Sequence, residues 1–174
     1  RLMHISDLHL GKRVNEYSML DDQAYILDEI LRIAKEEEVQ GVLIAGDVYD
    51  RPVPPSGAVR ILDDLLDQFA DRNVPVFFIS GNHDSRERLA FGAALFEKAA
   101  CIWRVRASAK IRWKDEYGEL NIWLMPFLKP AEVRMVYSEK EISTYTDAVR
   151  AVWKEWRLIR TSATFWLPIS LWRG

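Results

Sequence analysis

Three short apolar runs divide the first half of the chain, and polar residues follow each of them directly. The runs predict strands at Leu2–Ile5, Gly41–Ala45 and Val74–Ile79. A continuous apolar run of this length is typical of a strand that is buried on both faces. The pattern therefore predicts the strands of one buried sheet, with polar side chains gathered where those strands end.

The segments between these strands have the period of a helix. Apolar residues one turn or two turns apart predict a helix over Asp21–Glu38, and a second helix that begins near Ser56. The expected buried faces are Leu20, Ala24, Leu27, Leu31 and Ala34 in the first, and Val59, Leu62, Leu65, Leu66 and Phe69 in the second. A third helix is expected over Arg86–Ala99. This β-α-β-α-β order predicts an α/β fold with a parallel sheet covered by helices.

The pattern changes beyond Cys101. Ile111–Lys114 and Leu120–Met125, separated by Tyr117 and Gly118, predict a hairpin that begins a second sheet stacked on the first. Helices are expected over Ala131–Tyr137 and Asp147–Trp156, and Thr144 with Asp147 predicts a capping box for the latter.

Composition limits the classes of protein. A chain of 174 residues with 49% hydrophobic residues and a net charge of −2 is expected to form one domain, or one domain and a fragment of a second. A polyanionic ligand would need local positive charge or metal ions. The single cysteine, Cys101, fits a reducing compartment and is expected to be a buried apolar side chain. No apolar run approaches the roughly 18 residues of a membrane span, and no signal peptide is evident. We therefore expect a cytoplasmic protein without a membrane partner.

The polar residues after the three strands are candidate metal ligands. Asp7 and His9 follow the first strand, Asp47 the second, and Asn82 the third. Ligands bind at the carboxyl edge of open α/β sheets. Carboxylate, imidazole and amide donors suit divalent ions such as manganese, magnesium, iron or zinc. Each cluster alone is also a common turn or capping sequence, but three together favour a metal site.

A two-metal hydrolytic site gives each residue a role. A carboxylate must bridge both ions, and Asp47, at the tip of the central strand, is the candidate. In extended backbone Asp7 and His9 would point the same way and reach one ion, while Asn82 would hold the second. His83 is expected to face the scissile phosphate as a proton donor or charge stabiliser. Asp50 and Asp84, the remaining acidic residues of the second and third clusters, are expected to orient an imidazole.

Basic residues follow the same clusters and are expected to line the rim of the site. They could hold the phosphates that flank the one being cut, although each alone could be ordinary surface charge. These residues are Lys12, Arg13, Arg51, Arg86 and Arg88.

The three clusters resemble the D-x-H, G-D-x-x-D and G-N-H-D/E motifs of the calcineurin-like metallophosphoesterases. Ser6–Lys12, Ala45–Asp50 with Pro54-Pro55, and Ser80–Ser85 are most similar to the SbcD family of bacterial nuclease subunits. The likeness extends over residues 1–152. It implies an incomplete four-layer αββα sandwich with Asp7, His9, Asp47 and Asn82 as ligands and His83 as the catalytic imidazole.

The resemblance also implies an activity and partners. Members of the SbcD family use manganese to cut DNA phosphodiesters in repair and recombination. They act as exonucleases at duplex ends and as endonucleases on hairpins and single strands. The expected cofactors are two divalent ions, Mn²⁺ or else Mg²⁺. The expected partners are DNA, an SbcC-type ATPase and a second copy of the subunit. Two alternatives remain open, namely a phosphoesterase for small phosphoesters or phosphoproteins, and an inactive scaffold fragment.

The chain departs from this family at its end. The family supplies further histidine ligands downstream, in a His-Gln motif and a G-H-x-H motif, whereas this chain has only His4, His9 and His83. Residues 161–174 show neither the period of a strand nor that of a helix. Codons permitted for Leu158–Gly174, shifted by one base, can encode DPDQRNVLVAHQFVAG, which contains a strand and a His-Gln pair. We therefore expect residues 1–152 to form the N-terminal part of the nuclease domain and Trp153–Gly174 to be a frameshifted tail.

Overall fold

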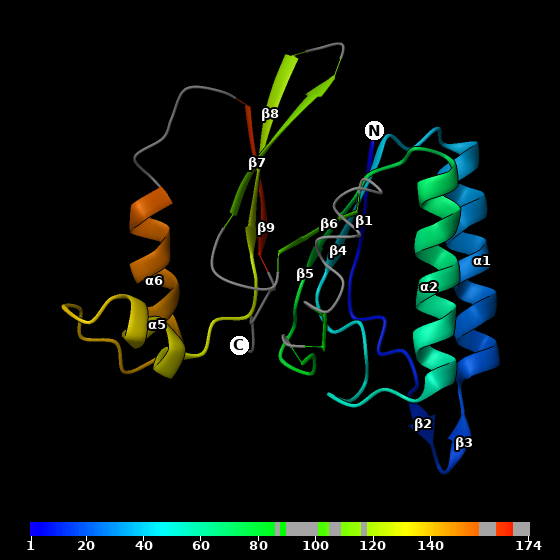
Figure 1. The fold of residues 1–174 in the computed structure, drawn as a ribbon, viewed down its shortest axis with the longest axis horizontal. Helices are drawn as coiled ribbons and strands as arrows, with labels where there is room; N and C mark the ends of the chain where they lie inside the picture. Colours follow the sequence, from blue (N-terminus) through cyan, green and yellow to red (C-terminus); the bar gives the residue numbers. More distant parts are fainter. Residues whose placement is uncertain (86–87, 90–100, 105–108, 116–117, 157–162, 169–174) are drawn as a thin grey trace.

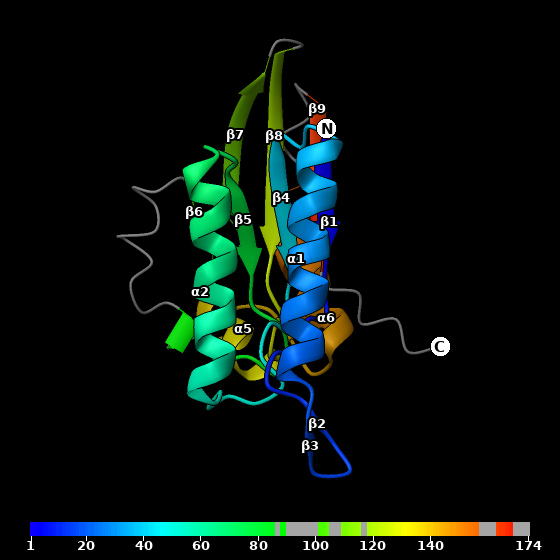
Figure 2. The ribbon, with the colours of Figure 1, turned by 90° about the vertical axis from the view of Figure 1, so that its right-hand side faces the viewer.

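The chain forms two stacked sheets, and a pair of helices covers the outer face of each (Figures 1 and 2). The computed structural model describes residues 1–85, 88–89, 101–104, 109–115, 118–156 and 163–168. The order of layers is helices, parallel sheet, second sheet, helices, which agrees with the expected αββα sandwich.

The first sheet contains four parallel strands in the order β1-β4-β5-β6. They are β1 (Leu2–Ile5), β4 (Gly41–Ala45), β5 (Val76–Ile79) and β6 (Cys101–Arg104). Helices α1 (Leu20–Glu36) and α2 (Ser56–Asp71) cover one face of this sheet. All four strands run in the same direction, so their carboxyl ends lie at one edge.

The period of two along the strands joins the layers. Val42 and Ile44 of β4 pack in the cluster that includes α1 and α2. The alternate residue Leu43 faces the other way and joins Ile122 and Leu124 of the second sheet. Because each side of β4 meets an apolar layer, every residue of this strand is buried, as its continuous apolar sequence predicts.

The second sheet has the order β7-β8-β9 and is covered by two further helices. Strands β7 (Ala109–Asp115) and β8 (Gly118–Met125) are antiparallel, and β9 (Ala163–Pro168) pairs with β8 in parallel. Trp123 and Met125 of β8 pack against residues of α5 (Pro130–Val136) and α6 (Tyr145–Trp156).

The predicted strands, the hairpin and most of the helices are confirmed within a few residues at their ends. The capping box is also confirmed, because Thr144 Oγ1 accepts a hydrogen bond from the Asp147 N–H at 3.1 Å and Asp147 Oδ2 accepts one from the Thr144 N–H at 2.9 Å. Of the expected helix over Arg86–Ala99, residues 88–89 are helical and the rest lie outside the described residues.

Three expectations differ from the structure. Val59 was expected on the buried face of α2, but it is 45% exposed; Ala58 is buried instead, because it lies one helical turn before Leu62 on the same face. Strand β6 was not predicted. Residues 161–174 show the period of neither a strand nor a helix, yet residues 163–168 form β9, a segment whose β-branched and aromatic residues favour a strand. The burial of the Cys101 side chain lies outside the described residues.

A small hairpin that the sequence analysis did not predict follows the first loop. Strands β2 (Arg13–Val14) and β3 (Tyr17–Ser18) pair through a turn whose central residues, Asn15 and Glu16, have φ values of 46° and 70°. Positive φ at both central residues is typical of the tight turn that suits a two-residue hairpin. The hairpin projects beyond the ends of the helices (Figure 2). None of the helices in the described ranges combines the length and hydropathy that a membrane span requires.

Candidate metal centre

The loops that follow β1 and β4 lie side by side at the carboxyl edge of the first sheet. The His9 N–H donates to the Asp47 carbonyl at 2.9 Å, and the Leu10 N–H donates to the Val48 carbonyl at 2.7 Å. The Asp50 N–H then donates back to the Leu10 carbonyl at 3.1 Å. The parallel pairing of β1 and β4 therefore continues past the strands and carries their polar residues to the same place.

Asp7, His9 and Asp47 converge in this region. One donor atom of each lies within 4.8 Å of the others, which is close enough for all three to contact one cation. The φ values of these residues are 55°, 43° and 47°, in the left-handed region that non-glycine residues rarely adopt. The expectation that extended backbone points Asp7 and His9 in the same direction was therefore wrong. The side chains meet because both residues turn sharply.

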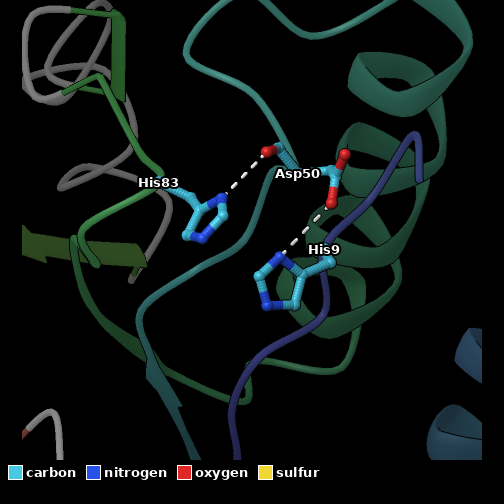
Figure 3. A group of neighbouring side chains, drawn as sticks. All are labelled: His9, Asp50 and His83. Carbon is cyan, nitrogen blue, oxygen red and sulfur yellow. Dashed lines mark hydrogen bonds and ion pairs between the residues drawn. The ribbon is translucent and has the colours of Figure 1, made fainter. Parts of the chain in front are cut away.

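A second group contains His9, Asp50 and His83, whose donor atoms also lie within 4.8 Å of one another (Figure 3). His9 Nδ1 lies 3.6 Å from Asp50 Oδ1, and His83 Nδ1 lies 3.0 Å from the Asp50 backbone carbonyl. A carbonyl oxygen only accepts hydrogen bonds, so His83 Nδ1 must carry the proton. The other ring nitrogen, Nε2, belongs to an exposed ring.

Asp47 joins the loops after β4 and β5. Its side chain is buried, and Oδ1 accepts a hydrogen bond from the His83 N–H at 3.0 Å. The neighbouring Gly81 has no side chain to obstruct this contact. A Cβ at Gly81 would lie 1.9 Å from Asp47 Oδ1 and 2.3 Å from Asp47 N. Glycine is therefore required for the third loop to approach the second.

Asp84 holds the same two loops together through the backbone. Its carboxylate accepts hydrogen bonds from the N–H groups of Val48, Tyr49 and Gly81, at 3.3, 3.1 and 2.8 Å. Burial raises the pKa of Asp84 and the charge of Asp47 adds to this, while the three N–H donors oppose it. Burial, with the nearby charges of Asp84 and Asp63, raises the pKa of Tyr49 to about 12.

Asp50 and Asp84 therefore differ in what they contact. The Asp50 carboxylate lies beside the His9 imidazole, whereas it is the backbone carbonyl of Asp50 that contacts His83. The oxygens of Asp84 instead accept bonds from main-chain N–H groups, so its contacts differ from the expected orientation of an imidazole. The reason is that Asp84 lies partly buried beneath the loops rather than at their surface.

The remaining predicted residues that the structure describes are exposed. Asn82 is exposed, directly before His83. Lys12 is exposed beside the first loop, and Arg51 Nε lies 3.8 Å from Asp50 Oδ2. Arg13 donates to the Glu16 carbonyl within the β2–β3 hairpin. Arg88 is exposed, and Arg86 lies outside the described residues.

The donor set fits a divalent ion. Two carboxylates and an imidazole meet in the first group, and the mixture of oxygen and nitrogen donors suits manganese, iron or zinc. His9 Nδ1 is buried and has no hydrogen-bond partner, since its 3.6 Å separation from Asp50 Oδ1 is too long for one. A buried polar atom without a partner is costly, and a cation in this region would reduce that cost.

One polar residue in contact with the site was missed by the sequence analysis. Gln23 of α1 reaches the first loop and hydrogen bonds to its backbone at Leu8, His9 and Gly11. A signal for it was present, because Gln23 lies three residues after Leu20 and four before Leu27, on the buried face of an amphipathic helix.

Comparison with known proteins defines the class of protein. The profile of the calcineurin-like phosphoesterases matches residues 1–162. The chain therefore belongs to this family, whose members are metal-dependent phosphoester hydrolases. Within it, the chain is similar to the SbcD subunit of the SbcCD nuclease from Staphylococcus saprophyticus subsp. saprophyticus, with 34% identity over 153 residues. That match covers 87% of this chain and 40% of the relative, so the chain spans well under half of its length.

Proposed function

We propose that this chain is the metal-binding N-terminal part of an SbcD-type DNA nuclease. The observation that carries the proposal is the convergence of Asp7, His9 and Asp47 at the sheet edge. The similarity to an SbcCD nuclease subunit over most of the chain supports DNA as the substrate. By the same similarity, an SbcC-type ATPase and a second copy of the subunit are the proposed partners of the whole protein.

The residues of the site have distinct proposed roles. Asp7 and His9 would hold one divalent ion, Asn82 would hold a second, and Asp47 would bridge the two. Two such ions, proposed to be Mn²⁺, supply a hydroxide nucleophile and neutralise charge at the phosphate. We assign to His83 the stabilisation or protonation of the phosphate oxygens through Nε2. The Asp50 carbonyl holds the other ring nitrogen at 3.0 Å and so fixes the orientation of the ring.

The rim offers a means of binding the substrate. Lys12 and Arg51 are exposed next to the first and second loops, where they could contact phosphates on either side of the one being cut. Such contacts position a nucleic acid without reading its sequence. We therefore propose cleavage that does not depend on the DNA sequence.

The tail is the part of the proposal that limits activity. We propose that residues 153–174 result from a shifted reading frame, so that ligands expected downstream are missing. With the missing base restored, His becomes residue 169, directly after the position of Pro168, whose backbone lies opposite Met125 in the β8–β9 pairing. Two residues after Met125, the Phe127 N–H donates to the Ser80 carbonyl at 3.0 Å, directly before the Gly81–Asp84 loop. The end of β9 is thus a suitable place for a further ligand.

Nuclease assays test the function. We expect the chain of 174 residues to show weak or no Mn²⁺-dependent cleavage of linear duplex DNA, and the same chain with the shifted frame restored to the family's length to cleave it. Hydrolysis of a nitrophenyl phosphodiester with no cleavage of DNA would instead favour a phosphoesterase for small substrates. Robust cleavage by the chain with its tryptophan-rich tail would contradict the proposed loss of ligands.

Sequencing of the gene tests the tail independently. A one-base deletion near the codon of Val152, with the His-Gln codons following in the shifted frame, is the expected result. A single open frame that encodes the tryptophan-rich tail and continues beyond it would overturn the frameshift and leave the metal centre unaffected.

A further inference from the structure

The side chain of Gln23 uses both ends of its amide on the loop that carries Asp7 and His9. Its Oε1 accepts a hydrogen bond from the Gly11 N–H at 2.9 Å. Its Nε2 donates to the His9 carbonyl at 2.8 Å and to the Leu8 carbonyl at 3.2 Å. Three contacts from one partly buried side chain therefore hold three of the four residues in Leu8–Gly11.

This loop needs such support because its conformation is unfavourable. Asp7 and His9 both have left-handed φ values, and Gly11 has a φ of +85°. Backbone of this kind persists only where the surroundings hold it. On one side the loop pairs with the residues after β4, through the His9 N–H and the Asp47 carbonyl. Gln23 supplies contacts from the side of α1.

The loop is also confined by the start of α2. A Cβ at Gly11 would lie 2.8 Å from the ring of Pro55 and 3.2 Å from Ala58 Cβ, so Gly11 lies against the start of α2. The loop thus lies between a polar contact from α1 and an apolar contact from α2. The apolar contact limits how closely Gly11 can approach, and the Gly11 N–H is oriented by its hydrogen bond to the amide of Gln23.

We propose that Gln23 is a positioning residue of the metal centre, which sets the backbone of Leu8–Gly11 and thereby places the donor atoms of Asp7 and His9. This inference rests on the proposed function in that it takes Asp7 and His9 as ligands. Gln23 itself touches no ligand atom. It acts on the backbone that bears the ligands, and such outer contacts commonly change metal affinity by 10-fold to 100-fold.

The test compares Gln23→Leu with Gln68→Leu. Leucine at position 23 keeps the size of the side chain and removes all three hydrogen bonds. Gln68 is a matched control, since it lies on α2, where it contacts Arg72 of the same helix at 3.4 Å. A second variant, Gln23→Glu, keeps the acceptor for the Gly11 N–H but places a carboxylate against two carbonyl oxygens.

Two measurements separate the inference from the proposed function. Hydrogen exchange of the metal-free protein reports on the loop itself. We expect the Gly11 amide to exchange at least about 10-fold faster in Gln23→Leu, but not in Gln23→Glu or Gln68→Leu. Calorimetric titration with Mn²⁺ should show affinity lower by about 10-fold or more in both Gln23 variants and unchanged in Gln68→Leu.

Each contrary result has one meaning. Exchange at the wild-type rate in Gln23→Leu overturns the positioning role, as does unchanged Mn²⁺ affinity or an equal loss in Gln68→Leu. Failure of the wild-type chain to bind Mn²⁺ contradicts the proposed function, and the exchange measurement then decides the role of Gln23 by itself. If Gln23→Leu does not fold, the Mn²⁺ affinity of Gln23→Glu decides the question.

Discussion

The two sheets differ in the residues that come directly after their strands. In the first sheet, β1 and β4 are followed by residues such as Asp7, His9 and Asp47 on backbone with left-handed φ values. In the second sheet, β8 is followed by Phe127 and Leu128, each 8% exposed. The first sheet therefore ends in groups that can bind a cation. Strand β8 of the second sheet is followed by buried side chains that stabilise the fold. Both sheets pack through the same apolar interface, yet different residues follow their strands. The packing of the strands is therefore separable from the chemistry of the site.

The largest expected effect comes from removing the charge of Asp47, the carboxylate that is proposed to bind both ions. Asp47→Asn keeps the size of the side chain and an oxygen for the His83 N–H, but loses the charge. We expect the affinity for Mn²⁺ in calorimetry to fall by at least about 100-fold, because a bridging carboxylate would contact both ions.

The control for this change is Asp67→Asn, which removes an exposed charge from α2. If metal binding depended only on overall negative charge, the two variants would lose affinity equally. Equal Mn²⁺ affinities in Asp47→Asn and the wild-type chain would show that the metal does not bind at the edge of the first sheet.

A smaller effect is expected from adding a methyl group to Gly81, in the loop after β5 of the first sheet, and to Gly118, at the start of β8 in the second. Gly81→Ala forces a Cβ to within 1.9 Å of Asp47 Oδ1, so we expect a loss of about 2 kcal/mol in the free energy of unfolding. Gly118→Ala meets no atom within 4 Å, but its φ of +131° disfavours alanine, and the expected loss is about 1 kcal/mol.

Denaturant unfolding of both variants measures these losses. The sharper contrast is in Mn²⁺ binding, which should weaken in Gly81→Ala and stay unchanged in Gly118→Ala. A greater loss of stability in Gly118→Ala would show that the close approach of the β4 and β5 loops matters less than the hairpin.

The smallest expected effect is at the capping box of α6. Thr144→Ala should lower the free energy of unfolding by about 1 kcal/mol at neutral pH, since the N–H of Asp147 loses its acceptor. The control is Thr146→Ala, which lies exposed in the same helix. Equal losses in the two variants would contradict a specific cap.

The cap also predicts a dependence on pH. The Thr144 hydroxyl, and then its N–H, lower the pKa of Asp147 from 3.8. A lowered pKa contributes stability above the unfolded value and loses it as the pH falls through the folded value. Asp147→Asn should therefore be less stable than the wild-type chain at neutral pH, and the difference should shrink as the pH falls below 3.8. A difference that persists unchanged well below the folded pKa would exclude the charge as its cause.

The layers of the fold were predictable because their signals are local. Strand β4 is apolar throughout, and α1 repeats apolar residues at helical spacing, so each pattern has one plain interpretation. Strand β6 was missed because Cys101–Arg104 is short and ends in a charged residue. The strand at residues 163–168 was missed because neither alternation nor a continuous apolar run marks it.

The convergence of three predicted residues could be expected from the sequence, but the backbone geometry that produces it could not. Asp7, His9 and Asp47 were expected to meet because parallel strands end at one edge, and they do. The left-handed turns that bring them together leave no periodic pattern, so the expected extended backbone was wrong. The contacts of Asp84 with main-chain N–H groups depend on how two loops pack, which the sequence does not reveal. Asp84 was therefore assigned to an imidazole.

The left-handed backbone at Asp7 matters for efforts to engineer this chain. Asp7 is exposed, and glycine would adopt its φ of 55° without the steric penalty of about 1 kcal/mol that a side chain incurs. Selection for heat resistance alone would then favour Asp7→Gly, which discards a proposed ligand. Any programme of thermostabilisation should therefore screen with manganese present, so that survival rewards the donors as well as the scaffold.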